Sequence, residues 1–178
     1  MRARRERVFA AAGLEELVTT PLMKAVQRND AAAVKSLIAQ GANVDELDAN
    51  GDAPLVMAAY KGHAAIVRLL LEAGADLGAV DPGMQATALH AAAYAGRTEA
   101  ARVLIEHGID IDRQGPRNGY TALHDAIWQN NVDTAQVLIE AGASLALRTH
   151  DGRTPLELAE AHGHREIGEL IRRKMGER

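Results

Sequence analysis

The apolar positions along this chain recur with a period of 33 or 34 residues. In every copy a leucine follows a Thr-Pro, Thr-Ala or Ala-Pro pair, and in the first four copies a glycine follows that leucine 19 residues later. Self-similarity at this period is typical of a solenoid, in which each copy is one supersecondary unit. The leucines are Leu22, Leu55, Leu89, Leu123 and Leu156, and the closing glycines are Gly41, Gly74, Gly108 and Gly142.

Each copy has the start and stop signals of two short helices. In the first copy Thr20 is a suitable N-cap, and Pro21 suits the first helical position because proline lacks the amide hydrogen that a helix start leaves unbonded. We expect this helix to end near Arg28 and a second helix to run from about Ala32 to the left-handed position at Gly41. Five copies predict ten repeat helices. Because helices this short are marginal in isolation, the stack has to hold them.

The copies resemble the ankyrin repeat. The second reads APLVMAAYKGHAAIVRLLLEAGAD, and the third and fourth carry the Thr-x-Leu-His core as TALH, at Thr87 to His90 and Thr121 to His124. The resemblance covers about residues 19–175 and implies an all-α fold, an ankyrin-repeat solenoid of stacked helix-turn-helix units joined by hairpin-like loops. It also implies a protein-interaction module, although the fold alone does not give the function because the family binds diverse partners.

We expect an N-terminal helical cap at residues 1–18 and an ankyrin repeat domain at residues 19–178. Val8 and Leu14 stand among arginines and glutamates, which is the amphipathic pattern of a cap. We interpret the arginines of this segment as the solvent-exposed face of the cap helix. The alternative is that they form a patch that binds membrane or nucleic acid. Arg172 stands at a position of the second helix that is apolar in the four earlier copies. We therefore expect the array to terminate there. The predicted repeats span about residues 19–50, 51–84, 85–118, 119–151 and 152–178.

Charge and composition narrow the range of partners. A net charge of -4 lacks the basic footprint that duplex DNA or RNA requires. The apolar stretch from Val8 to Leu14 is at the short end of the range for a signal peptide, and no cleavage pattern follows it. We expect a cytoplasmic monomer that binds neither nucleic acid nor membrane. The chain contains no cysteine, which leaves the redox compartment open.

No set of residues in the sequence indicates catalysis. His162 and His164 are the closest pair of histidines, but residues two apart on a helix point to different sides, which is a poor arrangement for a metal. His90 and His124 occupy the position at which ankyrin repeats hydrogen-bond the imidazole to the backbone and to the threonine hydroxyl. The loop at residues 115–119 lacks the lysine and hydroxyl of a phosphate-binding loop. We therefore expect no enzyme activity, no cofactor and no metal.

The five aromatic residues carry the main functional signal. Three of them follow a repeat leucine by five positions, and Tyr120 directly precedes the fourth Thr-Ala-Leu triplet. In ankyrin repeats these positions lie on the first helix facing the concave groove and on the adjoining finger, and both are exposed. The rings either cover gaps between alanine-rich helices or form a recognition surface, because Tyr and Trp dominate binding hot spots. With their polar neighbours, the predicted partner-binding residues are Tyr60, Lys61, Tyr94, Arg117, Tyr120, Asp125, Trp128, Gln129 and Arg153.

Two neighbouring loops differ from the others. The pairs Asn50-Gly51 and Asp151-Gly152 indicate tight hairpin-like turns. The second and third connections are one residue longer and contain Pro82 and Pro116. The insertions are either neutral variation in a tolerant surface loop or a pair of fingers shaped for a ligand.

These observations predict a non-enzymatic protein-interaction module that binds a protein partner through the concave face of repeats two to four. One alternative is a regulatory subunit or secreted effector, which would use the same groove in a different biological context. The other is a small-ligand or enzymatic site. It would require a deep pocket with convergent polar groups and shifted pKa values.

Overall fold

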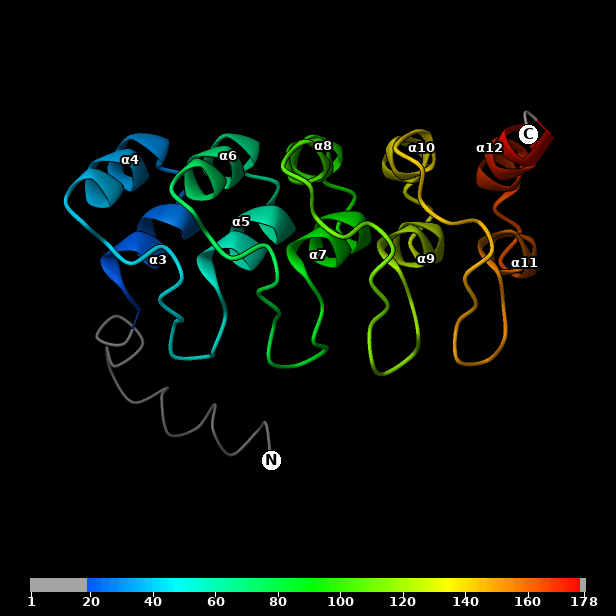
Figure 1. Ribbon diagram of the computed structural model, residues 1–178, viewed down its shortest axis with the longest axis horizontal. Coiled ribbons are helices and arrows are strands. Elements are labelled where there is room, and N and C mark those ends of the chain that lie inside the picture. Colours follow the sequence, from blue (N-terminus) through cyan, green and yellow to red (C-terminus); the bar gives the residue numbers. More distant parts are fainter. Residues whose placement is uncertain (1–18, 177–178) are drawn as a thin grey trace.

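The computed structural model describes residues 19–176, which form two layers of short helices (Figure 1). The layer nearer the loops holds the first helix of each repeat: α3 (Pro21–Gln27), α5 (Pro54–Lys61), α7 (Ala88–Tyr94), α9 (Ala122–Trp128) and α11 (Pro155–Ala161). The other layer holds the second helices: α4 (Ala31–Ala39), α6 (Ala64–Glu72), α8 (Thr98–Glu106), α10 (Val132–Glu140) and α12 (Arg165–Gly176).

The predicted all-α fold with ten repeat helices is confirmed within residues 19–176. The extended backbone of this region forms a single isolated bridge, between Val80 and Thr87. None of its helices is long and apolar enough to cross a bilayer. The cap predicted at residues 1–18 lies outside the described residues.

Threonine side chains begin four of the first helices. Thr20, Thr87, Thr121 and Thr154 each accept a hydrogen bond from the backbone amide three residues further on. Each of these bonds satisfies one of the amides that a helix start leaves without a partner. At α11 the bond is reciprocal, because the amide of Thr154 donates to the Glu157 carboxylate at 2.8 Å. The N-cap predicted at Thr20 is confirmed.

Packing between neighbouring repeats holds these short helices in place. The first helices pack on one another along the row, and the second helices do the same. Leu22, Leu55, Leu89 and Leu123 are at most 2 % exposed. Burying each of them contributes on the order of 1.5 to 3 kcal/mol. Leu156, in the last repeat, is only half-buried.

Four hairpin fingers connect the repeats and project from the layer of first helices (Figure 1). We number them finger 1 (residues 48–52), finger 2 (81–86), finger 3 (115–120) and finger 4 (149–153). A backbone hydrogen bond closes each finger, between residues four apart in fingers 1 and 4 and five apart in fingers 2 and 3: Asp48 to Asp52, Thr149 to Arg153, Asp81 to Ala86 and Gly115 to Tyr120. The extra residue predicted in the second and third connections therefore widens the two central fingers.

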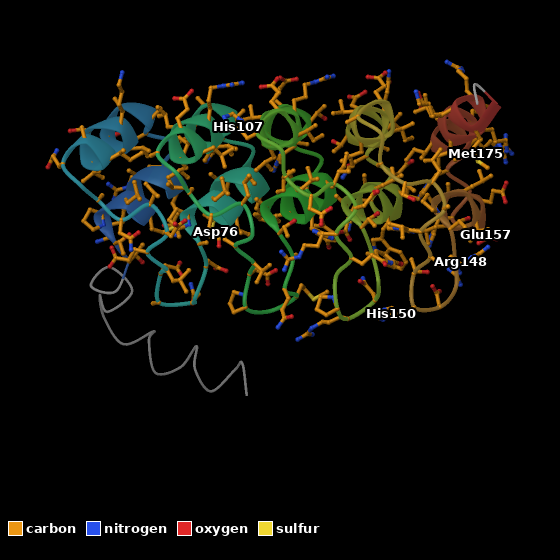
Figure 2. The ribbon with its side chains drawn as sticks, viewed as in Figure 1. Asp76, His107, Arg148, His150, Glu157 and Met175 are labelled. Carbon is orange, nitrogen blue, oxygen red and sulfur yellow. The ribbon has the colours of Figure 1, made fainter. Side chains whose placement is uncertain are left out.

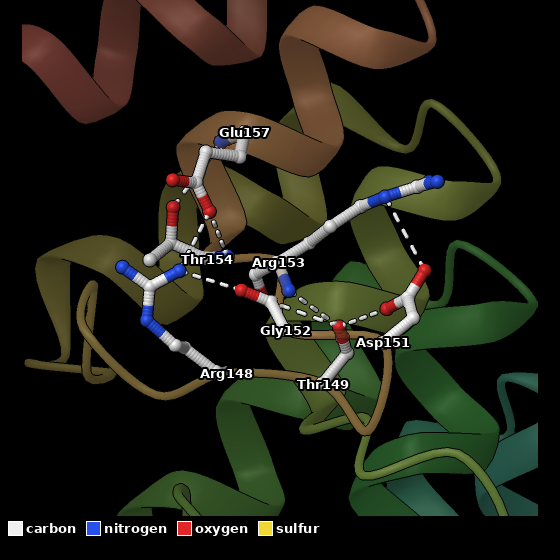
Figure 3. A network of polar contacts seen from close by, with 7 residues as sticks. All are labelled: Arg148, Thr149, Asp151, Gly152, Arg153, Thr154 and Glu157. Carbon is white, nitrogen blue, oxygen red and sulfur yellow. Dashed lines mark hydrogen bonds and ion pairs between the residues drawn. The ribbon is translucent and has the colours of Figure 1, made fainter.

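Side chains also hold finger 4 in place (Figure 3). The hydroxyl of Thr149 accepts the amide of Arg153 at 3.0 Å and donates to the carboxylate of Asp151. This hydroxyl holds the pKa of Asp151 below its usual value, and Asp151 also pairs with the Arg153 guanidinium at 3.2 Å. The guanidinium of Arg148 reaches the Glu157 carboxylate at 3.0 Å, which links the finger to α11.

Candidate functional site

A groove of about 760 Å³ runs across repeats two to four, between the first helices and fingers 1 to 3. Helices α5, α7 and α9 form one wall, and the fingers form the other. Within residues 19–176, no lysine or arginine lines this groove. Its principal side chains are four aromatic rings, three carboxylates and two methionines: Tyr60, Tyr94, Tyr120, Trp128, Asp52, Asp81, Asp125, Met57 and Met84.

Three of the aromatic rings stand at equivalent places in consecutive repeats. Tyr94 and Trp128 are the last residues of α7 and α9, and Tyr60 is the last but one of α5. These side chains are 50 % exposed at Tyr60, 48 % at Tyr94 and 46 % at Trp128. Each ring therefore combines a surface that packs against the repeats with a surface that remains available for contact.

Tyr120 lies differently from the prediction, which placed it exposed on a finger. Its side chain is half-buried, and its ring centroid lies 5.6 Å from that of His124 and 6.1 Å from that of Trp128. The backbone is fixed here because the Tyr120 carbonyl accepts hydrogen bonds from the amide of Gly115 at 2.7 Å and from His90 Nε2 at 3.1 Å. Burial raises the pKa of Tyr120. Tyr120 thus forms part of the groove wall.

Asp125 places a carboxyl group in the first turn of α9, facing the groove. Its side chain accepts no hydrogen bond and forms no ion pair within the described part of the chain. Burial raises the pKa of Asp125 to about 7. This happens because removal from water disfavours the charged form and no nearby cation offsets that cost.

The other two carboxylates of the groove, Asp81 and Asp52, differ in the hydrogen bonds that they accept. Asp81 accepts three backbone amides of its own finger, from Gly83, Met84 and Ala86, at 2.7 to 2.8 Å. The side-chain carboxylate of Asp52 accepts no hydrogen bond from the described residues, and burial together with the nearby acidic groups raises its pKa. The groove therefore holds two carboxyl groups without protein partners, Asp52 and Asp125.

Four predicted partner-binding residues are exposed but lie outside the groove lining: Lys61, Arg117, Gln129 and Arg153. Lys61 ends α5, and Gln129 is the C-cap of α9. Arg153 pairs with Asp151 as described for finger 4 (Figure 3). The remaining five predicted residues line the groove together.

The two histidines of the Thr-x-Leu-His motif make the predicted structural contacts. His90 Nδ1 meets the Thr87 hydroxyl at 2.8 Å while Nε2 donates to the Tyr120 carbonyl. His124 Nδ1 accepts the amide of Thr121 at 3.2 Å, so its proton is on Nε2. That Nε2 has no hydrogen bond of normal geometry within residues 19–176, although the Arg153 backbone is close enough to favour the proton there. Burial lowers the pKa of His124 to about 4 and also lowers that of His90.

The prediction that His162 and His164 point to different sides is wrong. Their ring centroids lie 5.7 Å apart with the planes 15° from parallel. The prediction treated both as helical residues, but His162 is the C-cap of α11 and His164 precedes α12, with Gly163 between them at a φ of 71°. The described residues contain no group of three or more His, Cys, Asp or Glu side chains arranged to hold a metal ion.

Sequence reasoning missed several lining residues, including Met57 on α5 and Met84 in finger 2. Met84 is 51 % exposed and belongs to one of the two lengthened fingers. The extra residue in the second connection was the sequence signal that could have pointed to Met84. Fingers 2 and 3 both contribute to the groove lining, as does the shorter finger 1 through Asp52, so the choice between shaped fingers and neutral variation stays a prediction.

Comparisons with known proteins agree with this architecture. A family model described as ankyrin repeats (3 copies) matches residues 10–81, and one described as ankyrin repeats (many copies) matches residues 89–139. A comparison with curated proteins gives no match. Ankyrin repeats are generally protein–protein interaction modules. With five Thr/Ala-x-Leu copies, paired helices and connecting fingers, the chain belongs to the ankyrin repeat family.

Proposed function

We propose that this chain is a non-enzymatic interaction module that holds a segment of a protein partner in the groove of repeats two to four. The observation that carries the proposal is the set of three half-exposed rings at equivalent places on consecutive first helices, Tyr60, Tyr94 and Trp128. Large rings that combine an apolar body with a polar tip are the residues that dominate binding hot spots. A segment lying across the groove would meet one ring in each repeat.

The spacing of these contacts favours a protein segment over a small molecule. The lining residues come from three consecutive repeats, so an extended chain can make a similar contact with each of them. Catalysis has less support, because the histidine of the groove is already engaged. His90 uses one ring nitrogen on Thr87 and the other on the Tyr120 carbonyl, which leaves neither free to transfer a proton.

The test is affinity purification of the tagged chain from cells of its native organism, followed by mass spectrometry and by direct binding measurements on the retained protein. Tyr94→Ala is the informative variant. The ring of Tyr94 is half-exposed, and its side chain makes no hydrogen bond within the described residues that the substitution would remove. We expect a loss of affinity of about tenfold or more, equivalent to roughly 1.4 kcal/mol.

Met175→Ala is the matched control. Met175 is 51 % exposed, lies outside the groove lining, and stands on α12 at the far end of the array (Figure 2). We expect this variant to retain the partner with unchanged affinity. A partner that binds the Tyr94→Ala and Trp128→Ala variants as tightly as the original chain would show that the groove is not the docking surface.

A further inference from the structure

We infer that the occupant of the groove is a protein segment that presents an arginine side chain to Asp125, beside the rings of Tyr120 and Trp128. The inference rests on the proposed function and specifies the chemistry of its partner. Three features of the groove carry it: an acidic residue at a position that is apolar in three other copies, aromatic rings near that residue, and a lining without basic side chains.

Asp125 departs from the other copies of the repeat. The position two residues after the repeat leucine is Met57 in the second copy, Ala91 in the third and Leu158 in the fifth, and the first copy has Lys24. The fold therefore accepts an apolar side chain at this place. A carboxyl group that is largely withdrawn from water without a hydrogen bond costs stability. That cost is offset if a partner supplies a cation.

The aromatic rings beside Asp125 favour the same kind of occupant. Trp128 follows Asp125 by three residues on α9, so the two side chains share a face of the helix. The ring centroids of Tyr120 and Trp128 lie 6.1 Å apart with an angle of 60° between their planes. Tyr120 also interacts electrostatically with Asp125. A cation paired with Asp125 would thus lie beside two aromatic rings, and the faces of Trp and Tyr attract cations.

The remaining charges of the groove disfavour other occupants. Asp52 and Asp81 belong to its lining, and they repel an acidic segment. A wholly apolar segment would cover Asp52 and Asp125 without giving either a partner. Among cations, a guanidinium fits this place better than an ammonium, because it is more weakly hydrated, stacks on aromatic faces and pairs with a carboxylate through two parallel hydrogen bonds.

A random-peptide library displayed on phage, selected on the full chain, tests this inference. We expect the recovered peptides to share an arginine, and we would measure the binding of the synthesised peptides by fluorescence anisotropy. Replacing that arginine by glutamine, or Asp125→Asn in the protein, should each weaken binding about tenfold or more. The two changes together should weaken it little further, because they remove the same pair.

Asp133→Asn is the control variant, since it removes the same charge from an exposed position on α10 outside the groove lining. It should leave peptide binding unchanged. Peptides without a shared arginine, or an arginine peptide that binds Asp125→Asn at full strength, would overturn the inference. If such peptides still lose affinity for Trp128→Ala, the proposed groove function survives that failure. If they bind Trp128→Ala and Tyr94→Ala undiminished, the groove function fails as well.

Discussion

The indole ring of Trp128 lies edge-on against the imidazole of His162, with the ring centroids 4.8 Å apart and the planes at 70°. The contact joins the first helix of repeat four to the C-cap of the first helix of repeat five. Trp128 therefore has a packing role in addition to its exposed surface.

A double-mutant cycle measures this contact. Trp128→Ala and His162→Ala, made singly and together, should show a coupling of about 0.5 to 1.5 kcal/mol in the free energy of unfolding, as edge-to-face ring pairs do. The same cycle with Tyr94→Ala in place of Trp128→Ala should be additive, because Tyr94 belongs to repeat three and lies two repeats away from His162. Chemical denaturation gives all of these values, and a coupling near zero for Trp128 and His162 would contradict the packing role.

The two faces of α8 should respond differently to truncation. Leu104 is fully buried between repeats, so Leu104→Ala should cost about 2 to 5 kcal/mol of unfolding free energy. Glu106 pairs with Arg68 at 2.9 Å, but the two side chains are 57 % and 46 % exposed. Glu106→Ala should therefore cost no more than about 1 kcal/mol. Equal losses of unfolding free energy in urea denaturation would contradict the assignment of Leu104 to the buried face of α8 and of Glu106 to its exposed face.

A glycine in finger 3 allows two fingers to approach closely. The amide of His150 donates to the Asn118 carbonyl at 2.8 Å, and Gly119 has a φ of 70°. A Cβ atom at Gly119 would lie 2.6 Å from His150 Cδ2 and 2.9 Å from its backbone nitrogen. Gly119→Ala should therefore destabilise the fold through both the unfavourable φ and the collision.

Gly142→Ala separates these two effects. Gly142 has a φ of 93°, but a Cβ atom there would meet no other atom within 4 Å. Both substitutions bear the cost of a left-handed conformation, about 1 to 2 kcal/mol. Only Gly119→Ala adds the collision, and we expect it to lower the unfolding free energy by about 1 kcal/mol or more beyond Gly142→Ala. Equal thermal shifts for the two variants would mean that the fingers move apart at no cost.

The sequence predicts most of the fold because its signals are local and repeated. The Thr20 cap, the Pro21 start and the Gly41 end each act within one turn of a helix, so one copy is enough to recognise them. The five copies then confirm one another. Repeat boundaries and the partner-binding role of the nine candidate residues stay predictions.

Side-chain contacts that depend on how loops and helices pack could not be predicted from the sequence. The half-burial of Tyr120 depends on how finger 3 closes and on the ring of Trp128. The stacking of His162 on His164 depends on a left-handed glycine between two helices. The difference between Asp125 and the other copies could have been noticed in the sequence, because three of those copies have an apolar residue at the equivalent position. The burial of Asp125 could not, since that requires the packed neighbours.

His124 should make stability fall as the solution is acidified. Its folded pKa of about 4 lies below the ordinary 6.5, so between these values the unfolded chain takes up a proton that the folded chain does not. Stability is therefore fully present above about pH 6.5 and is lost as the pH falls toward 4. His124→Gln removes this titration and keeps a residue that can cap Thr121.

The measurement is the difference in unfolding free energy between the original chain and His124→Gln at several pH values. At about 1.4 kcal/mol per pKa unit, the advantage of the histidine over glutamine should shrink by about 2 to 3 kcal/mol between pH 7 and pH 4.5. A difference that stays constant over this range would mean that His124 titrates normally in the fold.

Asp125 should have the opposite effect in the same range of pH. Its folded pKa of about 7 lies above the ordinary 3.8, so the folded chain keeps a proton that the unfolded chain has lost. Stability is fully present below about pH 4 and is lost as the pH rises toward 7. Because the slopes of His124 and Asp125 oppose each other, the pH profile of the original chain alone would show neither. Each has to be isolated with its own variant.

Asp125→Asn should therefore stabilise the chain at pH 8, where the carboxylate is charged, and have little effect at pH 4, where it is neutral. The gain at pH 8 should be about 1 to 3 kcal/mol, less than the full pKa shift implies because the side chain is partly exposed and solvent screens its charge. Asp133→Asn on α10 should give no comparable gain at either pH. Denaturant titrations at the two pH values decide the matter. If Asp125→Asn destabilises the chain at pH 8, then its carboxylate is satisfied within the protein and does not await a cationic partner.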